Sequence, residues 1–311
     1  MKILIIDQLH ESIHPLMKAA DLHYDYRPEI KKEEVLEILP QYEGIMVRSK
    51  MRFDQPELDR GTKLQFIARS GAGMDNIDDA YATKKGIHLI NAPEGNRDAV
   101  GEHTIGMLLL LMNKMHTADL EVRKGIWDRE GNRGWELMGR TVGIIGYGHM
   151  GQAFAKRLAG FGVKVLAYDK YRLDYSDQYA QEASLEEIFN DTDVLSFHTP
   201  LTEETRAWCT LEFFKKFRKP IIFLNAARGE IAPLHDLNEA IDQKLILAAG
   251  LDVLEVEKFD KLTPKQKEEL KQLQERANVI FTPHVGGWTF ESYQRLNEVM
   301  IQKIQAFLEG T

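Results

Sequence analysis

Three glycines with a fixed spacing lie in the middle of the chain, directly after a run of apolar residues. Gly146, Gly148 and Gly151 form the pattern G-x-G-x-x-G between an expected strand, Val142–Ile145, and an expected helix, Met150–Leu158. The first glycine permits a tight turn, the second lets the backbone approach a pyrophosphate, and the third allows the helix to pack closely on the strand. Free N–H groups at the start of the helix attract the phosphates. This spacing predicts a dinucleotide site.

An acidic residue follows the next expected strand, Val163–Tyr168. Asp169 comes 18 residues after Gly151, where a carboxylate can accept hydrogen bonds from the adenosine ribose. Its charge repels the 2′-phosphate of NADP, so the pattern favours NAD, although Lys170 and Arg172 beside it could accommodate a phosphate. Because strand, loop, helix, second strand and acid occur in order, a glycine turn without a ligand is the weaker interpretation.

Two side chains in the second half of the chain have types that can do chemistry and follow expected strands. Arg228 follows the expected strand Ile221–Leu224 and offers a planar guanidinium to an anionic group; as a surface residue it would instead pair with Glu230. His284 follows the expected strand Val279–Phe281, and histidine titrates in the range needed to exchange a proton near neutral pH. Ligands bind at the carboxyl ends of parallel strands, so both positions suit a reacting group.

The elements that must position these residues alternate along the chain in the manner of parallel α/β units. The other expected strands are Lys2–Ile6, Gly44–Val47, Leu64–Ala68, Ile87–Ile90, Val194–Phe197 and Leu247–Leu251. The other expected helices include one between Asp78 and Gly86, a long helix over Asp98–Arg123 after the turn-rich Asn91–Asn96, and a tail helix over Thr289–Glu309, with a polar loop over Gly125–Gly139. We predict an α/β protein with two doubly wound, parallel-sheet (Rossmann-like) domains. The cofactor domain spans 95–284, and a discontinuous, flavodoxin-like substrate domain spans 1–94 and 285–311.

The composition excludes several classes of partner. The chain has 311 residues and a net charge of −8, whereas nucleic acids and anionic membranes both favour a basic face. Cys209 is the one cysteine, which excludes an internal disulfide and a multi-cysteine metal site, and we expect no metal. With no signal peptide and no apolar run of membrane length, this composition indicates a cytoplasmic protein without a nucleic-acid or membrane partner.

Seven segments occur in the order and form found in one enzyme family. They are Ser70–Asp78, Asn91–Asn96, Gly101–Gly106, the glycine loop, Asn225–Gly229, Gly250–Val253 and Thr282–Gly287. Over nearly its whole length the chain therefore resembles the D-isomer-specific 2-hydroxyacid dehydrogenases, and among them most the phosphoglycerate dehydrogenases. Because the sequence ends at Thr311, the resemblance is to a short form without the C-terminal regulatory domain.

The resemblance implies a catalytic trio of Arg228, Glu257 and His284, in which Glu257 orients His284 and raises its pKa. Glu255 is the alternative partner, but the family spacing, five residues beyond Asp252, selects Glu257. The implied cofactor contacts come from Gly146, Gly148, His149, Met150, Gly151, Asp169, Ala226, Asp252 and Gly287. Met150 could instead be helix core, and Asp252 a strand-end cap. The implied substrate contacts come from Arg48 and the turn containing Ser70, Ala72 and Gly73, with Lys50 and Arg133 as further candidates for a substrate phosphate.

The resemblance also sets the expected reaction, with some departures. It implies reversible, NAD-dependent hydride transfer at C2 of a D-2-hydroxy acid, with 3-phosphoglycerate as the first expectation and glycerate (hydroxypyruvate or glyoxylate as oxo acid) as the alternative. A non-enzymatic, corepressor-like NAD sensor is the alternative from another class. Lys258 stands where the family often has proline, Trp288 stands where many members have serine, and segment 258–278 is longer than usual. The family also implies a homodimer, with helix 98–123 and loop 125–139 at the partner.

Overall fold

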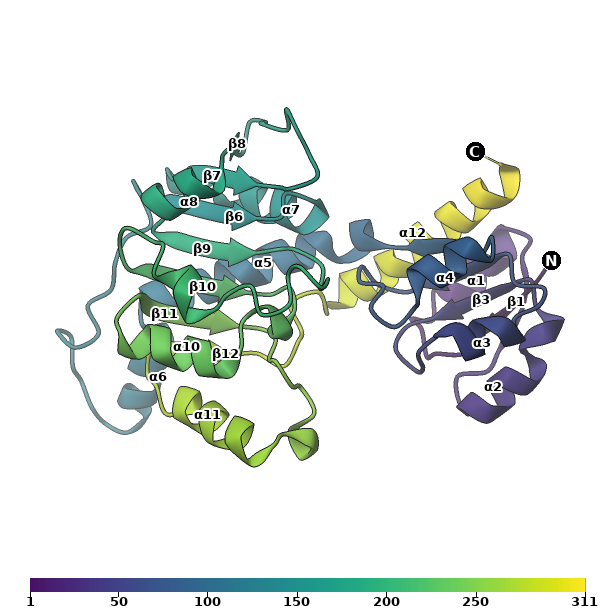
Figure 1. Ribbon diagram of the computed structural model, residues 1–311, viewed down its shortest axis with the longest axis horizontal. Helices are drawn as coiled ribbons and strands as arrows, with labels where there is room; N and C mark the ends of the chain where they lie inside the picture. Colours follow the sequence, from purple (N-terminus) through teal and green to yellow (C-terminus); the bar gives the residue numbers. More distant parts are fainter. Residues whose placement is uncertain (311) are drawn as a thin grey trace. The chain divides into compact units, whose positions relative to one another are not determined.

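Two compact units, each built on a parallel β-sheet, make up the protein (Figure 1). The computed structural model describes residues 1–310. Unit 1 comprises Met1–Arg97 and the segment that begins at Trp288, and unit 2 comprises Asp98–Gly287. The boundaries expected from the sequence lie a few residues earlier in the chain. The prediction of two doubly wound α/β domains is confirmed.

Unit 1 has a five-stranded sheet in the order β2-β1-β3-β4-β5, with every pair parallel. Its strands are β1 (Lys2–Ile5), β2 (His23–Tyr26), β3 (Gly44–Val47), β4 (Phe66–Arg69) and β5 (His88–Asn91). Side chains alternate along a strand, so Ile3 and Ile5 pack on one face and Leu4 on the other. The first face is covered by α1 (Ile13–Ala19) and α12 (Phe290–Glu309), and the second by α2 (Lys32–Ile38), the turn η1 (Leu39–Gln41), α3 (Gln55–Arg60) and α4 (Asp79–Lys84).

Unit 2 has a seven-stranded parallel sheet in the order β12-β11-β10-β9-β6-β7-β8. Its strands are β6 (Thr141–Ile145), β7 (Lys164–Tyr168), β8 (Gln181–Glu182), β9 (Val194–Phe197), β10 (Ile221–Asn225), β11 (Ile246–Leu251) and β12 (Val279–Phe281). One face packs against α5 (Pro93–Met112) and α7 (His149–Leu158). The other packs against α8 (Leu185–Asp191), α9 (Leu211–Phe214), α10 (Leu234–Asp242) and α11 (Pro264–Gln274). Short turns of 3₁₀-helix are η2 (Ala159–Phe161), η3 (Gly229–Ile231) and η4 (Phe259–Lys261).

The prediction of a single helix over Asp98–Arg123 is wrong. The structure has two helices there, α5 and α6 (Met115–Arg123), because Lys114 adopts left-handed φ of +50° and ends the continuous hydrogen-bond ladder. Met115 looked like a continuation of the apolar stripe, yet 54% of it is exposed. The turn expected at Asn91–Asn96 is also partly wrong, since α5 begins at Pro93, a residue suited to the first helical turn.

Local capping signals account for several helix starts. Ser184 with Glu187 and Thr263 with Gln266 each form a reciprocal capping box, and Asp78 accepts a hydrogen bond from the N–H of Tyr81. The helix that follows Asp78 begins where it is expected from the sequence. Strand β2 and helices α1 to α3 were not predicted, although α3 also begins with a capping box, formed by Asp54 and Glu57.

Both sheets have a point where the strand order reverses, and ligands of open α/β sheets bind outside the carboxyl ends of the strands at such points. In unit 1 the reversal lies between β1 and β3, and in unit 2 between β6 and β9. Within residues 1–310, no helix has the length and apolar character required to cross a membrane.

Candidate active site

The glycine loop follows β6 at the reversal point of unit 2. Gly146 has φ of +92°, and a Cβ there would lie 2.8 Å from the backbone of His198. A Cβ on Gly151 would lie 2.2 Å from the carbonyl oxygen of Gly146. A Cβ on Gly148 would meet no atom within 4 Å. Packing within the protein thus requires the first and third glycines, whereas the space beside the second is open to a ligand.

Asp169 lies next to this loop at the end of β7. Its carboxylate accepts hydrogen bonds from the backbone N–H of Tyr147, at 2.8 Å, and of Tyr171, at 3.0 Å. Both neighbouring cations have protein partners: Lys170 pairs with Glu204, and Arg172 donates to the carbonyl oxygen of Tyr147. The structure therefore brings the predicted acid and the glycine loop together.

Tyr147, inside the glycine loop, fastens the loop to the segment after β7. Its ring is fully buried, and its hydroxyl donates to the carboxylate of Asp177 at 3.0 Å. Burial, together with this hydrogen bond, raises the pKa of Tyr147 far above its ordinary value. The sequence alone indicates no role for this residue.

Arg228 lies in the turn after β10, which the buried side chain of Asn225 holds in shape. The Asn225 amide oxygen accepts from the N–H of Ala227 at 3.0 Å, and its amide nitrogen donates to the carbonyl of Arg228 at 2.9 Å. The next residue, Gly229, approaches the backbone of Leu254 so closely that a Cβ would lie 1.9 Å from its carbonyl carbon. This close approach brings the turn that follows β10 against the segment that follows β11.

His284, in the turn after β12, is hydrogen-bonded to Glu257. The distance from Nδ1 to Oε1 is 2.8 Å, and each side chain is 47% exposed. The hydrogen bond to Glu257 raises the pKa of His284, against the opposing effects of burial and of the Arg228 charge. The contact expected from the sequence is present; its role in catalysis stays a prediction.

Asp252, at the end of β11, holds the turn that contains His284. Its carboxylate accepts from the N–H groups of Val285, at 2.9 Å, and Gly286, at 2.8 Å, and from the hydroxyl of Thr282, at 2.6 Å. His284 itself has left-handed φ of +55°, and its N–H donates to the carbonyl of Asp252 at 2.8 Å. These bonds correspond to the strand-end cap considered for Asp252.

His103, on α5, completes this cluster and was missed by the sequence analysis, although it lies in the matching segment Gly101–Gly106. Its Nε2 is 2.9 Å from the Thr282 hydroxyl oxygen and 3.4 Å from Asp252. Since Thr282 gives its proton to Asp252, His103 is the donor to Thr282. Burial acts to raise the pKa of Asp252, but the bonds from His103, Thr282 and the backbone outweigh it and lower the pKa.

The predicted substrate residues lie in unit 1 at the ends of β3 and β4. The N–H of Ser70 donates to the carbonyl of Val47, which places Ser70 next to Arg48. Ser70 is 2% exposed, and within residues 1–310 its hydroxyl has no hydrogen-bond partner. Gly71 begins a turn that continues through Ala72 and Gly73. Its φ is +148°, a backbone conformation that only glycine adopts readily.

The three candidate phosphate-binding cations have different surroundings. Lys50 donates its ammonium protons to the carbonyls of Pro28 and Ile30. Arg133, an exposed residue of unit 2, pairs with Glu130. The guanidinium of Arg48 instead stacks on an aromatic ring.

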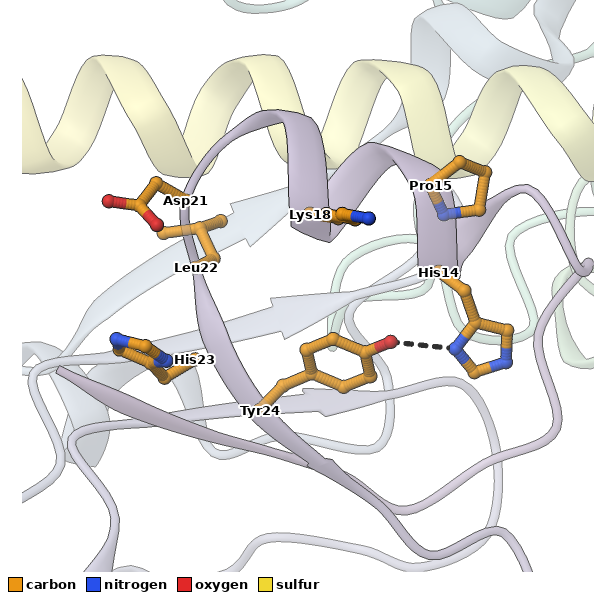
Figure 2. Close-up of a pocket in the computed structure, with 7 residues that line it drawn as sticks. All are labelled: His14, Pro15, Lys18, Asp21, Leu22, His23 and Tyr24. Carbon is orange, nitrogen blue, oxygen red and sulfur yellow. Dashed lines mark hydrogen bonds between the residues drawn. The ribbon is translucent and has the colours of Figure 1, made fainter.

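Two hollows in the surface contain none of the predicted site residues. One, of about 490 Å³, is an open depression beside α1 and β2, where His14 is hydrogen-bonded to Tyr24 (Figure 2). The other, of about 270 Å³, lies in unit 2 beside Leu111 and Trp135. Among residues 1–310, no three His, Cys, Asp or Glu side chains are grouped so that they could hold a metal ion.

The sequence of unit 2 decides the family. Residues 105–286 match the profile of the NAD binding domain of D-isomer specific 2-hydroxyacid dehydrogenases. The chain belongs to this family. As a member of the D-2-hydroxyacid dehydrogenases, it is an oxidoreductase that acts on CH–OH groups with NAD, and the glycine loop, Asp169, Arg228 and His284 all lie within the matched segment.

Individual dehydrogenases of the family are similar over most or all of the chain. Hydroxypyruvate reductase of Thermotoga maritima is 34% identical over 88% of this chain and 88% of its own length. D-3-phosphoglycerate dehydrogenase of Archaeoglobus fulgidus is 34% identical over 100% of this chain, which spans only 58% of that relative. The structure of D-lactate dehydrogenase from Aquifex aeolicus, complexed with NAD and lactic acid, covers 100% of this chain with a TM-score of 0.84 and 26% identity. The relatives share the reaction class and differ in the acid that their names specify.

Proposed function

We propose that this dehydrogenase interconverts a D-2-hydroxy acid and its 2-oxo acid with NAD and NADH, and that the pair is 3-phosphoglycerate and 3-phosphohydroxypyruvate. The observation that carries the reaction type is the His284–Glu257 hydrogen bond, at 2.8 Å, in the unit that matches the NAD binding domain. Strands β10, β11 and β12 are adjacent and parallel, so the turns that carry Arg228, Asp252 and His284 follow neighbouring strands at one edge of the sheet.

The proposed chemistry assigns one task to each residue. Bound NADH supplies the hydride that C2 of the oxo acid accepts. Arg228 binds the substrate carboxylate and the carbonyl oxygen with its planar N–H groups. The Nδ1–H of His284 donates to Glu257, so Nε2 is the nitrogen that gives its proton to the carbonyl oxygen and takes it back in the oxidising direction.

We propose NAD rather than NADP as the cofactor. Asp169 carries the negative charge at the end of β7, and the two nearby cations are engaged by Glu204 and by the carbonyl of Tyr147. A 2′-phosphate would approach Asp169 without a free cation to offset the repulsion. The comparison of NADH with NADPH is the test.

The phosphorylated substrate is proposed from Arg48 and from the resemblance to phosphoglycerate dehydrogenases. Lys50 and Arg133 are bonded to protein acceptors, whereas Arg48 stands beside Ser70, whose buried hydroxyl has no partner within the described residues. Hydroxypyruvate is the second candidate, favoured by the similarity to the Thermotoga maritima hydroxypyruvate reductase, of which this chain covers 88%.

The decisive experiment measures NADH oxidation with 3-phosphohydroxypyruvate, hydroxypyruvate and glyoxylate, each repeated with NADPH. The proposal expects the highest kcat/KM with the phosphorylated acid and NADH. His284→Ala should lower kcat by about 10²- to 10⁴-fold, the usual contribution of a general acid, while NADH still binds. Turnover that survives in His284→Ala would refute its assignment, and no turnover by the unaltered protein with any 2-oxo acid would favour the NAD-sensing alternative.

We also propose that two copies of the chain associate through α6 and the loop that follows it. This part of unit 2 exposes a group of large apolar side chains, namely Met115, Leu120, Val122, Ile126, Trp127, Trp135 and Met138. Exposed apolar groups of this kind mark protein–protein contacts in soluble proteins. Size-exclusion chromatography with light scattering should give twice the chain mass of 35.7 kDa, and a mass equal to one chain would contradict the proposal.

A further inference from the structure

Arg48 lies at the reversal point of the unit 1 sheet, at the end of β3. The carboxylate of Asp7, which follows β1, accepts the backbone N–H of Arg48 at 2.7 Å. This bond joins the ends of the two strands between which the order reverses. The backbone of Arg48 is therefore held in place by a hydrogen bond. It lies at the point where sheets of this kind bind ligands.

Two aromatic residues from the C-terminal part of the chain cover the guanidinium. Its central carbon lies 3.8 Å from the centre of a Trp288 ring and 5.9 Å from the centre of the Tyr293 ring. The two aromatic rings are themselves in contact, with centres 4.6 Å apart and planes inclined by 50°.

The aromatic pair is anchored in turn to the segment after β1. The hydroxyl of Tyr293 donates to the carbonyl of Gln8 at 3.0 Å, and its ring meets His10 edge-on with centres 5.5 Å apart. Arg48, Trp288 and Tyr293 all belong to unit 1. The stack of these three side chains therefore forms within one compact unit.

Stacking occupies the face of a guanidinium and leaves its N–H groups, which lie in the plane, available as donors. Within residues 1–310 the guanidinium of Arg48 has no side-chain hydrogen bond or ion pair, in contrast to Lys50. A guanidinium with a covered face and unused in-plane donors matches the bidentate geometry of a phosphate or carboxylate. Serine, which many family members have at the position of Trp288, has no ring with which to form this stack.

We propose that Trp288 and Tyr293 are positioning residues that hold the guanidinium of Arg48 for a second anionic group of the substrate, a phosphomonoester rather than an uncharged hydroxymethyl group. The inference rests on the proposed 2-oxo acid reduction and deepens it by assigning its substrate specificity to this stack. A pre-oriented arginine loses less conformational entropy when it binds an anion, so the stack acts on the KM of the phosphorylated substrate.

The experiment compares Trp288→Ala, Trp288→Leu and Trp288→Phe with the unaltered protein, using 3-phosphohydroxypyruvate and hydroxypyruvate with NADH. In the Ala and Leu variants the ratio of kcat/KM for the phosphorylated acid to that for the free acid should fall about tenfold, through a rise in the KM of the phosphorylated acid. A tenfold change corresponds to ~1.4 kcal/mol, within the range of cation–π contacts. Trp288→Phe should keep most of the ratio, because it keeps an aromatic face.

Phe290→Ala is the matched control, since Phe290 lies two residues away and is 93% exposed. Its substrate ratio should equal that of the unaltered protein. Trp288→Leu keeps apolar bulk without a ring, so it provides the test even if the Ala variant does not fold.

The outcomes separate the inference from the proposed function. An unchanged ratio in Trp288→Leu, an equal loss for both substrates, or a Phe variant as impaired as the Leu variant would each overturn the inference while leaving the reductase activity in place. Absence of turnover by the unaltered protein with both acids would overturn the proposed function itself.

Discussion

Replacement of Gly148 by alanine should separate cofactor binding from stability. The second glycine of the loop is unlike its neighbours, because an added methyl group would meet no protein atom within 4 Å. Its φ of −84° is also available to alanine. If Gly148 is glycine only so that the backbone can approach a pyrophosphate, then Gly148→Ala should fold normally and bind NADH poorly.

The expected magnitudes follow from this geometry. Alanine is a weaker N-cap than glycine, but it reduces the entropy of the unfolded chain, and these effects of up to about 1 kcal/mol oppose each other. Loss of one hydrogen bond between the loop and a charged phosphate costs about 1.5–3 kcal/mol. The Kd for NADH should therefore rise about 10- to 100-fold, with a net change in the free energy of unfolding below about 1 kcal/mol.

The assay combines a fluorescence titration with NADH and urea unfolding without cofactor. Gly151→Ala is the contrasting variant, because its methyl group would lie 2.2 Å from the carbonyl oxygen of Gly146. It should lose about 1–3 kcal/mol of unfolding free energy through overpacking. Gly160→Ala, where a Cβ also meets nothing within 4 Å, should affect neither measurement strongly. Wild-type NADH affinity in Gly148→Ala, or destabilisation equal to that of Gly151→Ala, would refute the reasoning.

Two further predictions concern side chains bonded near the site. The hydrogen bond that His284 donates to Glu257 raises the pKa of His284, and reduction needs the protonated imidazole, so activity is present below this pKa and is lost as pH rises through it. In Glu257→Gln the loss should begin at lower pH, as measured by kcat/KM for reduction against pH; an unchanged profile would contradict the pairing. Tyr147→Phe removes the buried hydroxyl that donates to the Asp177 carboxylate, and should lower the free energy of unfolding by about 1.5–3 kcal/mol in urea titrations, whereas an unchanged midpoint would show that this bond does not stabilise the loop.

The sequence was informative wherever one local pattern decides the structure. Buried parallel strands such as β6 and β10 are short apolar runs, and the boxes at Ser184 and Thr263 mark helix starts within four residues of chain. No local sequence pattern indicated the break between α5 and α6 at Lys114. Its left-handed φ of +50° is uncommon for lysine, and the apolar period continues across it through Met115. Propensity and periodicity both favoured one helix, and the fold overrode them.

The same distinction applies to the candidate site. Gly146, Asp169, Arg228 and His284 could be named because each follows a strand, and the parallel topology brings strand ends to one edge. His103 could not be given a role in that way, since it lies on a helix and contacts Thr282, which lies 179 positions further along the chain. The pattern of one element contains no information about such a distant contact.

Trp288 departs from the family pattern, and the contacts of its side chain are needed to interpret this departure. In the sequence it stands in place of serine beside a glycine pair, which suits a packing residue and a site residue equally well. The structure places its ring 3.8 Å from Arg48, the one candidate phosphate-binding cation that makes no side-chain hydrogen bond within the described part of the chain. A bulky ring that served packing alone would not need to lie on an unpaired guanidinium at the reversal point of a sheet. Substitutions at residue 288 should therefore change the preference between the phosphorylated and the uncharged substrate more than they change the stability of unit 1.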